Sequence, residues 1–540
     1  MNPNILFLIP PAIPFNDLES CGQIKFDMYI PTSIPIGVLS ISSYLKKYCD
    51  VNIRILDFNI VLNSCERKDK SLKEILTKYF LEITCDFKPE IIGISALFNS
   101  NYSYLNSMSE MAKSTFPNSV IIAGGGLPTN LYKEVLEIAP NIDVVCFGEA
   151  EIPILDLVRS DNRKKFLSDD PCWVTQEKKV LNIKPQTKFV KILDEIPPID
   201  YNLIRFEDYQ KISRYHGDNT NAVVISLMTS RGCPFHCCFC ASHTVHGKEI
   251  RFMSAERVLQ DIDELINNYG VNTFLIEDDH FLGDRERALK ILNGLKSKNI
   301  NIEFPNGVAV YAIDEEVADA FKEAGVKIVT LAIESGSEYV LKEIIHKPLN
   351  LSIVNKVVSI LRSRDIPMRA FFIIGFPGES EENRRETAEF IRKTGFNWVA
   401  IMIATPIAGS ELFKICKENN YLISPNIEDF YYGKGNIKTD EFTPEYIEET
   451  RYLMNLDFNF INNYDLLNGN YEAALLAFND VIRRVPNHAF AFYSAAQCYE
   501  KLGMQNEQKL YFEKFVNIID NDKKWRSYAE SFKLFTPENR

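Results

Sequence analysis

Three cysteines lie close together on one short stretch of this 540-residue chain. Cys233, Cys237 and Cys240 have the spacing C-x3-C-x2-C. Thiolates are the usual ligands of iron–sulfur clusters, and a cubane normally takes four of them, so three leave one iron open for a further ligand. The spacing therefore predicts a loop whose cluster takes part in chemistry, and we call residues 232–240 the cluster loop.

Zinc and disulfides are the alternative uses of these cysteines. Zinc takes Cys and His in fours, and His243 or His246 could complete a Cys3His site, but no second C-x2-C pair stands at zinc-ribbon distance. Twelve cysteines in 540 residues are a modest density without a secretion signal, which disfavours a disulfide framework. Cys238 lies between two of the predicted ligands, and we expect it to be their neighbour rather than a fourth ligand.

With the aromatic Phe239 before the last cysteine, the loop resembles the signature of the radical S-adenosylmethionine (SAM) superfamily. In that superfamily the three cysteines bind a [4Fe-4S] cluster, and the amino and carboxylate groups of SAM chelate the open iron. One electron then cleaves SAM and yields a 5′-deoxyadenosyl radical. The resemblance implies both cofactors, a flavodoxin-like or ferredoxin-like electron donor, and a contact between Phe239 and SAM.

The chain after the cluster loop alternates strand-like runs with helical patterns, which is typical of βαβ units around a parallel sheet. The core of the resembled superfamily is an incomplete (β/α)6 barrel, and the expected strand count agrees. The expected strands are residues 223–229, 273–276, 307–311, 327–333, 369–374 and 397–403.

Polar or glycine residues follow three of these strands, where parallel barrels place their ligand sites. Taken alone, each group could be an ordinary turn, but their shared position favours ligand contacts. The resemblance implies that Glu277 and Asp278 help to bind the methionine amino group of SAM. It likewise implies that Glu334 and Ser335 bind the ribose and that Gly375 lines the adenine side.

Residues 1–160 form a separate α/β unit in this interpretation. Five short apolar runs, separated by helical segments, predict a doubly wound, Rossmann-type domain. These runs are residues 4–10, 51–56, 91–95, 120–123 and 143–147. A Gly-Gly-Gly sequence follows the fourth run, and glycine lets the backbone approach a bulky ligand closely.

This unit resembles the cobalamin-binding domain that precedes the radical domain in one large class of these enzymes, the class B methyltransferases. The resemblance rests on an S-x-L element, on the glycines and on the first helix after Pro35. It implies that cobalamin contacts Ser95, Leu97, Gly124, Gly125 and Gly126.

One motif of the cobalamin-binding domain departs from the family pattern. The axial-histidine motif D-x-H-x-x-G keeps Asp17 and Gly22, but Glu19 stands where the histidine would be, and no histidine occurs before His216. If cobalamin binds, its cobalt has no histidine ligand from this domain. The alternative is a domain that has lost the cofactor and only shapes the substrate pocket.

The remaining chain divides into a linker or crossing segment at residues 161–220, the radical SAM core with its extension at 221–440, and a helical tail at 441–540. In the tail, Gly469 and Gly503 are one tetratricopeptide period apart, as are Phe478 and Phe512. Such helices could form a groove for a peptide or carrier protein, or a cap that stabilises the barrel.

Charge and hydropathy indicate which partners and which cellular compartment the sequence favours. A net charge of −13 argues against general binding to nucleic acids or anionic membranes. No apolar run is long enough to span a membrane, and an oxygen-sensitive cluster suits a reducing cytoplasm, where we expect the protein.

The sequence thus predicts an α/β enzyme, a cobalamin-dependent radical SAM methyltransferase that acts on an unactivated carbon through the catalytic Cys233, Cys237 and Cys240. A radical cyclase, dehydratase or rearrangement enzyme is the alternative. Methylthiolation of RNA is disfavoured, because no N-terminal cysteine set or basic RNA-binding domain is visible. A non-catalytic scaffold would require the strand-end carboxylates to be coincidental. A peptide, a carrier-bound intermediate and a small natural product all remain open as the substrate.

Overall fold

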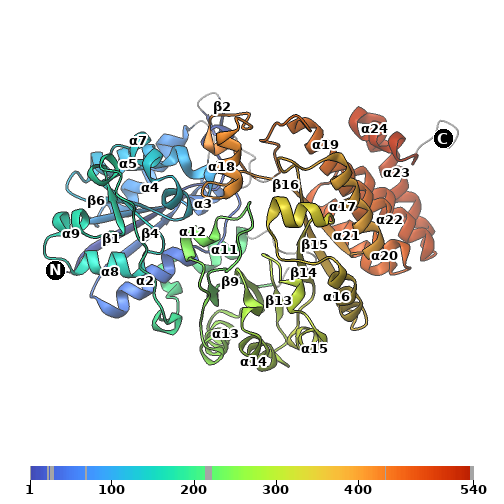
Figure 1. The fold of residues 1–540 in the computed structure, drawn as a ribbon, viewed down its shortest axis with the longest axis horizontal. Coiled ribbons are helices and arrows are strands. Elements are labelled where there is room, and N and C mark those ends of the chain that lie inside the picture. The colour runs from blue at the N-terminus through green and yellow to red at the C-terminus, as the bar shows by residue number, and fades with distance from the viewer. Residues whose placement is uncertain are drawn as a thin grey trace.

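The structure is a computed structural model that describes residues 2–20, 23–24, 30–66, 70–212, 222–431 and 433–534. In chain order it consists of an N-terminal α/β unit, a central open barrel and a helical tail (Figure 1). None of the helices within these ranges combines the length and the apolarity that a bilayer crossing requires.

The N-terminal unit is built on a six-stranded sheet with the order β4-β1-β5-β6-β7-β8. Its strands are β1 (Asn4–Ile9), β4 (Asn52–Asp57), β5 (Ile91–Ser95), β6 (Val120–Gly124), β7 (Val144–Cys146) and β8 (Trp173–Thr175). All neighbouring strands are parallel except β7 and β8. Along β1, Leu6 and Leu8 enter one hydrophobic core, whereas Ile5 and Phe7 enter another. Burial of both faces is typical of a parallel sheet between two layers of helices.

All five strands expected from the apolar runs are present, and the prediction of a doubly wound unit is confirmed. The unit contains a hairpin of β2 (Glu19–Ser20) and β3 (Gln23–Ile24) and the helices α1 (Phe15–Leu18), α2 (Ile36–Tyr48), α3 (Phe58–Ser64), α4 (Leu72–Thr84), α5 (Tyr102–Thr115), α6 (Gly126–Asn130), α7 (Tyr132–Ile138), α8 (Glu151–Arg159) and α9 (Arg163–Asp169). Gly22 of the axial-histidine motif and His216 lie outside the described residues.

The sixth strand of this sheet comes from the segment that we expected to link the two domains. β8 pairs antiparallel with β7, and Trp173 within it is fully buried. Val190, Leu193 and Ile196 also join the core on that side of the sheet. Part of segment 161–220 therefore packs as part of the first unit, and the boundaries given above stay a prediction.

Six of the described strands form the central barrel as two three-stranded sheets, β13-β12-β9 and β14-β15-β16. They are β9 (Val224–Leu227), β12 (Thr273–Ile276), β13 (Asn301–Glu303), β14 (Val329–Glu334), β15 (Met368–Ile374) and β16 (Trp398–Ile403). Pairing within each sheet is parallel, and two isolated parallel bridges, Ile302 to Val326 and Val308 to Leu331, connect the sheets. The prediction of a partial (β/α)6 barrel is confirmed.

Helices cover the outside of the barrel (Figure 1). They are α13 (Ala255–Tyr269), α14 (Arg285–Leu295), α15 (Glu315–Ala324), α16 (Ser352–Arg362) and α17 (Glu381–Thr394). The first begins where its sequence pattern predicts, because the Ser254 side chain accepts a hydrogen bond from the Arg257 N–H and caps the helix.

The prediction for the third barrel strand was wrong. The strand is β13, and residues 307–311 contribute one bridge and the 3₁₀ turn η5 (Val310–Ala312). Gly307 has φ +79°, a turn conformation that interrupts a strand. Val308 and Val310 are buried, so the hydrophobicity of this segment indicates burial and not strand geometry.

The tail consists of successive helices that pack around a core of their own. The helices are α19 (Pro444–Leu456), α20 (Tyr464–Leu467), α21 (Tyr471–Arg484), α22 (Ala489–Lys501), α23 (Gln505–Asn521) and α24 (Lys523–Ser531). Asn459 ties the tail to the barrel edge, since its side chain accepts from the Val399 N–H at 2.8 Å and donates to the Val399 carbonyl at 2.7 Å. The tetratricopeptide assignment stays a prediction.

His488 at the start of α22 makes the stability of the tail depend on pH. Its buried ring stacks on Phe460 with centroids 4.5 Å apart, and Nδ1 accepts a hydrogen bond from the Ala491 N–H. Burial lowers the pKa of His488 to about 4. The unfolded chain takes up a proton below about pH 6.5, whereas the folded chain does not until about pH 4, so stability is lost as the pH falls through this window.

We expect His488→Asn to remove this pH dependence, because Asn can still cap the helix but does not titrate. Between pH 7 and pH 5, the wild-type tail should lose up to about 2 kcal/mol of stability that the variant does not lose. Hydrogen exchange of the α22 amides, compared between the two proteins at each pH, measures the difference. Equal changes in the two proteins would contradict the assignment.

Candidate active site

The cluster loop is anchored to the barrel and to a later helix through the peptide groups of Cys238. The Cys238 N–H donates to the Ile345 carbonyl at 2.9 Å, and its carbonyl accepts from the Leu412 N–H at 2.8 Å in α18 (Glu411–Glu418). The Cys238 side chain is buried in the barrel core, whereas Cys233 and the other two predicted ligands are half-buried. Three thiols of the loop are therefore accessible to a cluster, whereas the thiol of Cys238 is buried.

The three thiols suit a cubane better than a single metal ion. Within the described ranges, no three His, Cys, Asp or Glu side chains converge as they would around one zinc ion. Each thiolate of a cubane binds a different iron, so convergence on one point is not required. Burial raises the pKa of all three thiols, that of Cys240 to about 12. Positive charge is therefore needed beside them to favour the thiolates.

Lys347 supplies that positive charge. Only 17% of its side chain is exposed, and its Nζ lies 3.2 Å from Oε1 of Glu334. Burial opposes the charge of Lys347, but Glu334 and the thiolates of Cys237 and Cys233 raise its pKa overall. Glu334 itself has φ +74° at a register shift of β14, an uncommon conformation for a non-glycine residue. The backbone of Glu334 is thus bent at the strand end where the sequence predicts a ligand contact.

The acidic residues after β12 have divided roles. The carboxylate of Asp278 accepts hydrogen bonds from the backbone N–H and hydroxyl of Thr229 and from the hydroxyl of Ser230, and these contacts hold the segment before the cluster loop. Glu277 accepts from the Ser226 hydroxyl at 3.0 Å. Asp279 accepts a hydrogen bond from the Ser242 hydroxyl just after the cluster loop, and its charge adds to the burial that raises the pKa values of the Cys233 and Cys240 thiols. The proposed contacts of Glu277 and Asp278 with SAM stay predictions.

The other residues predicted to contact SAM lie in ordered turns. Ser335 is fully buried, and its hydroxyl lies 3.1 Å from the Thr387 hydroxyl. Gly375 has φ +88°, and a Cβ there would lie 2.9 Å from Cγ2 of Ile447, so the position excludes a side chain. The Phe239 ring packs 6.2 Å from the ring of Phe376, measured between centroids, in the turn after β15. The contact between these two rings places the cluster loop beside the turn after β15.

The predicted cobalamin contacts gather at the carboxyl edge of the first sheet. Ser95 ends β5 and pairs with Gly124 at the end of β6. Gly125 has φ +105°, and a Cβ there would lie 2.4 Å from the Ala96 carbonyl oxygen. Leu97 and its neighbour Phe98 are each 58% exposed at this edge. We call Gly124, Gly125 and Gly126 the glycine cradle, and the edge of the sheet that carries them the glycine edge. A glycine cradle beside exposed apolar side chains fits a large, partly apolar ligand such as a corrin.

Glu19, which replaces the family histidine, serves a different purpose in this structure. Its Oε1 accepts a hydrogen bond from the backbone N–H of Leu72 at 3.1 Å. Leu72 is the first residue of α4, so the carboxylate stabilises the N-terminus of that helix.

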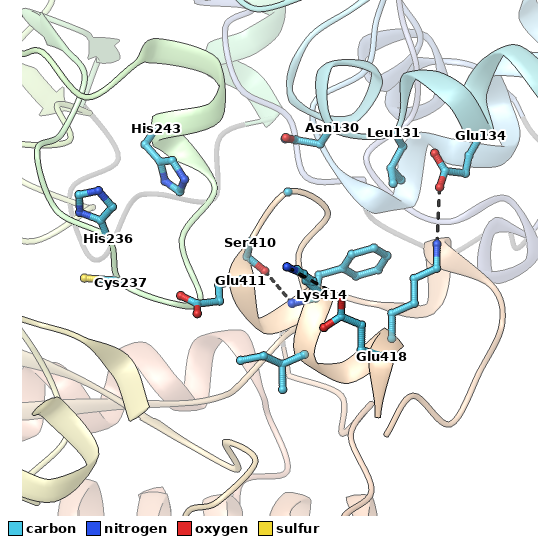
Figure 2. Close-up of a pocket in the computed structure, with 14 residues that line it drawn as sticks. Asn130, Leu131, Glu134, His236, Cys237, His243, Ser410, Glu411, Lys414 and Glu418 are labelled. Carbon is cyan, nitrogen blue, oxygen red and sulfur yellow. Dashed lines mark hydrogen bonds and ion pairs between the residues drawn. The ribbon is translucent and has the colours of Figure 1, made fainter. Parts of the chain in front are cut away.

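A cavity of about 660 Å³ lies between the cluster loop and the first domain, where α6 ends and α7 begins just after the glycines. Figure 2 shows His236, Cys237 and His243 on one side of this cavity and Asn130, Leu131 and Glu134 on the other, with α18 between them. Lys417 of α18 pairs with Glu134 at 3.6 Å. The helix α12 (Ser242–His246), which follows the cluster loop, approaches the cradle directly, since a Cβ on Gly126 would lie 4.0 Å from Val245.

The chain combines a doubly wound domain that carries a glycine cradle with a parallel barrel that presents three thiols. This combination is typical of iron–sulfur enzymes that bind a second, large cofactor. Comparison with known families agrees: residues 31–158 match the B12 binding domain and residues 227–391 match the radical SAM superfamily. The chain is 30% identical to cytidylyl-2-hydroxyethylphosphonate methyltransferase of Streptomyces wedmorensis, over 84% of this chain and 90% of that protein.

Solved structures share the fold. The cobalamin-dependent SAM radical enzyme OxsB, with aqua-cobalamin and SAM bound, aligns with a TM-score of 0.66 at 14% identity, over 99% of this chain and 82% of that chain. The radical SAM methyltransferase TsrM of Kitasatospora setae aligns with a TM-score of 0.58 at 15% identity, over 79% and 80%. The chain belongs to the radical SAM superfamily, in the class with an N-terminal B12-binding domain. It is an enzyme whose cofactors are a [4Fe-4S] cluster, SAM and cobalamin.

One group near the cluster loop, Lys347, escaped the sequence interpretation, and the sequence did not distinguish Asp279 from the two carboxylates before it. Lys347 lies far along the chain from the cysteines, and nothing in its local sequence marks it as buried. Asp279 stands beside two residues that we had singled out, and a turn gives no signal for which of three adjacent carboxylates points to the loop. Only the three-dimensional arrangement distinguishes them.

We expect Lys347→Gln to make the cluster harder to reduce, because the variant loses the cation that favours the added electron. The midpoint potential should fall by some tens of millivolts, the size expected for a nearby charge at an effective dielectric constant of about 20. A redox titration followed by electron paramagnetic resonance measures it. Lys342→Gln is the matched control, since Lys342 is exposed on the same segment. Equal potentials in all three proteins would contradict this role.

Proposed function

We propose that this enzyme is a methyltransferase that transfers a methyl group to an unactivated carbon of a small molecule. The observation that carries the proposal is the cavity between the cluster loop and the α6–α7 segment of the first domain. Cys237 of the predicted cluster site lines this cavity together with Asn130 and Leu131 of the segment that follows the glycines, so a substrate there would lie beside both predicted cofactor sites, as a reaction that needs both cofactors requires.

The chain's residues have distinct tasks in this proposal. Cys233, Cys237 and Cys240 hold the cluster, and Lys347 stabilises the negative charge of the thiolates. Gly125 and Gly126 let the ends of β5 and β6 approach closely, and the corrin would bind at the glycine edge that they form. When bound, SAM and the cluster supply a hydrogen-abstracting radical, and cobalamin supplies the methyl group. A flavodoxin-like or ferredoxin-like protein is the proposed electron donor.

A radical reaction requires that bulk water be kept from the reacting atoms. α18 forms one wall of the cavity through Phe413, Lys414 and Ile415, and the Lys417 pair with Glu134 joins this helix to the first domain. Exclusion of water protects a radical from quenching and strengthens every polar contact inside. The protein thereby contributes placement and shielding, while the cofactors carry out the chemistry.

The relative with 30% identity is named for a cytidylylated phosphonate, a small molecule, and we take this compound as the first acceptor to test. Protein loaded with cluster and cobalamin would be incubated anaerobically with reductant, methyl-deuterated SAM and the acceptor, and then with a panel of related nucleotide-linked acids. The proposal predicts a deuterium-labelled product that depends on added cobalamin. An acceptor that is consumed without incorporating label would instead support a radical cyclase, dehydratase or rearrangement enzyme.

A further inference from the structure

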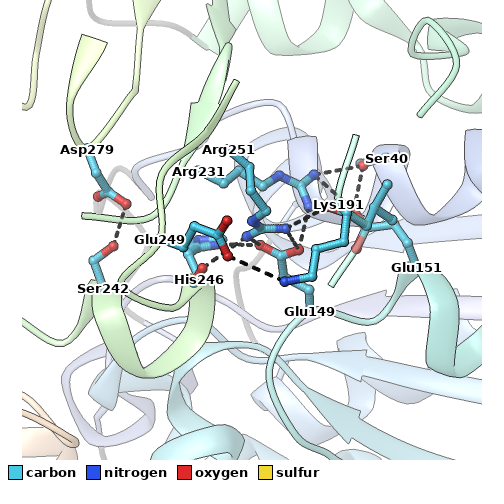
Figure 3. Close-up of polar contacts among 11 residues, drawn as sticks. Ser40, Glu149, Glu151, Lys191, Arg231, Ser242, His246, Glu249, Arg251 and Asp279 are labelled. Atoms are coloured by element: carbon cyan, nitrogen blue, oxygen red, sulfur yellow. Dashed lines mark hydrogen bonds and ion pairs between the residues drawn. The ribbon is translucent and has the colours of Figure 1, made fainter. Parts of the chain in front are cut away.

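A single buried carboxylate of the first domain contacts both ends of the segment that carries the cluster loop. Glu149 lies between β7 and α8 and is only 6% exposed. Its Oε1 accepts hydrogen bonds from Arg251 at 2.7 Å and lies 2.8 Å from Nδ1 of His246. Its Oε2 accepts from Arg251 at 2.9 Å and lies 3.2 Å from a guanidinium nitrogen of Arg231. Figure 3 shows this carboxylate at the centre of its three partners.

The three partners flank the cluster loop in the sequence. Arg231 comes immediately before residue 232, and His246 ends the helix that follows the loop. Arg251 lies in β11 (Arg251–Phe252), which pairs antiparallel with β10 (Ser230–Arg231), so the chain returns beside its starting point. Glu149 therefore contacts the entry, the exit and the closing strand pair of one loop.

This network is built for placement more than for stability. Arg231 also pairs with Glu151 at 2.9 Å, and all the charged members except His246 are at least nine-tenths buried. Desolvation opposes burial of such charges, so a complete network adds little net stability, whereas its fixed geometry specifies one arrangement. Although burial disfavours its charge, Arg251, His246 and Arg231 lower the pKa of Glu149 to about 2.

A continuous route of contacts joins this carboxylate to the glycine cradle. Gly148, directly before Glu149, packs against α12, where a Cβ would lie 3.5 Å from the Val245 carbonyl oxygen. The cradle residue Gly126 also lies beside this helix, since a Cβ there would be 4.0 Å from Cγ2 of Val245. The strand β7 that precedes Gly148 pairs with β6, which ends at the cradle.

We propose that Glu149 is a positioning residue that couples the two cofactor sites, so that occupation of the cobalamin cradle changes the affinity of the cluster loop for SAM. Coupling of this kind is reciprocal, and its usual size is about 5- to 150-fold in affinity. The inference rests on the proposed function, because both cofactors must bind. The physical link is the fixed set of charged contacts, which transmits a displacement of the first domain to both ends of the loop.

The test compares SAM binding with and without cobalamin. Protein with an oxidised cluster, which does not cleave SAM, is dialysed to equilibrium against radiolabelled SAM, with or without saturating hydroxocobalamin. In the wild-type protein the two dissociation constants should differ by about fivefold or more. In Glu149→Gln, which keeps the size of the side chain but loses its charge, the ratio should fall to within about twofold of one.

Glu249→Gln is the matched control, because Glu249 is an exposed carboxylate of the same region whose partner is Lys191 at 3.4 Å. This variant should keep the wild-type ratio. His246→Leu is a second test variant, since it removes one of the contacts without leaving a buried guanidinium unpaired, and we expect a ratio between those of wild type and Glu149→Gln. If Glu149→Gln fails to fold or to assemble its cluster, His246→Leu decides the question.

The proposal is overturned if the wild-type ratio is one, or if the test variants that fold keep the wild-type ratio. If the wild-type protein retains no cobalamin, that result would contradict the proposed function as well. If the wild-type protein retains both cofactors but the variants leave the coupling unchanged, only the proposed role of Glu149 would be contradicted. The electron paramagnetic resonance signal of the reduced cluster with SAM gives an independent readout, because it should change with cobalamin in the wild type but not in Glu149→Gln.

Discussion

Replacement of any one of Cys233, Cys237 and Cys240 by Ala is expected to abolish the formation of 5′-deoxyadenosine from SAM. Each variant loses one of only three thiolate ligands, and a cubane held by two is not retained stably. Cys238, the remaining cysteine of the loop, is no substitute, since its side chain is buried in the barrel core. Iron and sulfide content of the reconstituted proteins and chromatography of the nucleoside products measure the effect.

Cys238→Ala is the control within the same loop. Its peptide contacts to Ile345 and Leu412 remain, and only a small buried side chain is lost, so cluster content and deoxyadenosine formation should persist at a modest cost in stability. The assignment of the ligands would be contradicted if this variant behaved like the other three, or if any of those three kept wild-type deoxyadenosine formation.

Gly125→Ala is expected to prevent retention of cobalamin. The position has φ +105°, which L side chains rarely adopt, and the new Cβ would lie 2.4 Å from the Ala96 carbonyl oxygen. Something must move, and the atom in the way belongs to the backbone at the end of β5 and not to a flexible side chain. The cradle should therefore shift by enough to disrupt a close-fitting ligand, with a loss in affinity of at least tenfold, about 1.4 kcal/mol.

Cobalt content after reconstitution and desalting measures the effect of Gly125→Ala, and circular dichroism reports whether the domain has kept its fold. Gly37→Ala provides the comparison, because a Cβ at Gly37 in α2 meets nothing within 4 Å. Full cobalt retention by folded Gly125→Ala would show that the cradle is not where the corrin lies.

Both α/β units could be predicted from the sequence because their strands are buried on both sides. Runs such as Ile91 to Ile94 are apolar at every position, a pattern that few exposed segments share. The cluster cysteines could be predicted because a single loop carries all three, so that spacing alone brings them together. β8 was missed because its core residues are interspersed with charged and proline-rich stretches that resemble a linker.

Residues that act through distant contacts could not be predicted. Glu149 lies in a short turn whose sequence, Gly148 to Glu151, gives no indication of which carboxylate turns inward. Its partners come from a β-strand pair and a helix about one hundred residues later in the chain, and only the packing of the two domains brings them within hydrogen-bond distance. The same holds for α18, whose role as a cavity wall depends on where the chain returns after the last barrel strand.

The most direct test of cobalamin dependence is the cobalt content of the wild-type protein. Anaerobically purified, cluster-reconstituted protein would be incubated with hydroxocobalamin, desalted, and analysed for cobalt and for ultraviolet–visible bands of the bound corrin. We predict stoichiometric retention of cobalt, with bands that differ from those of the free cofactor. Folded, cluster-loaded protein that retains no cobalt would contradict the account and would favour a radical reaction that proceeds without cobalamin.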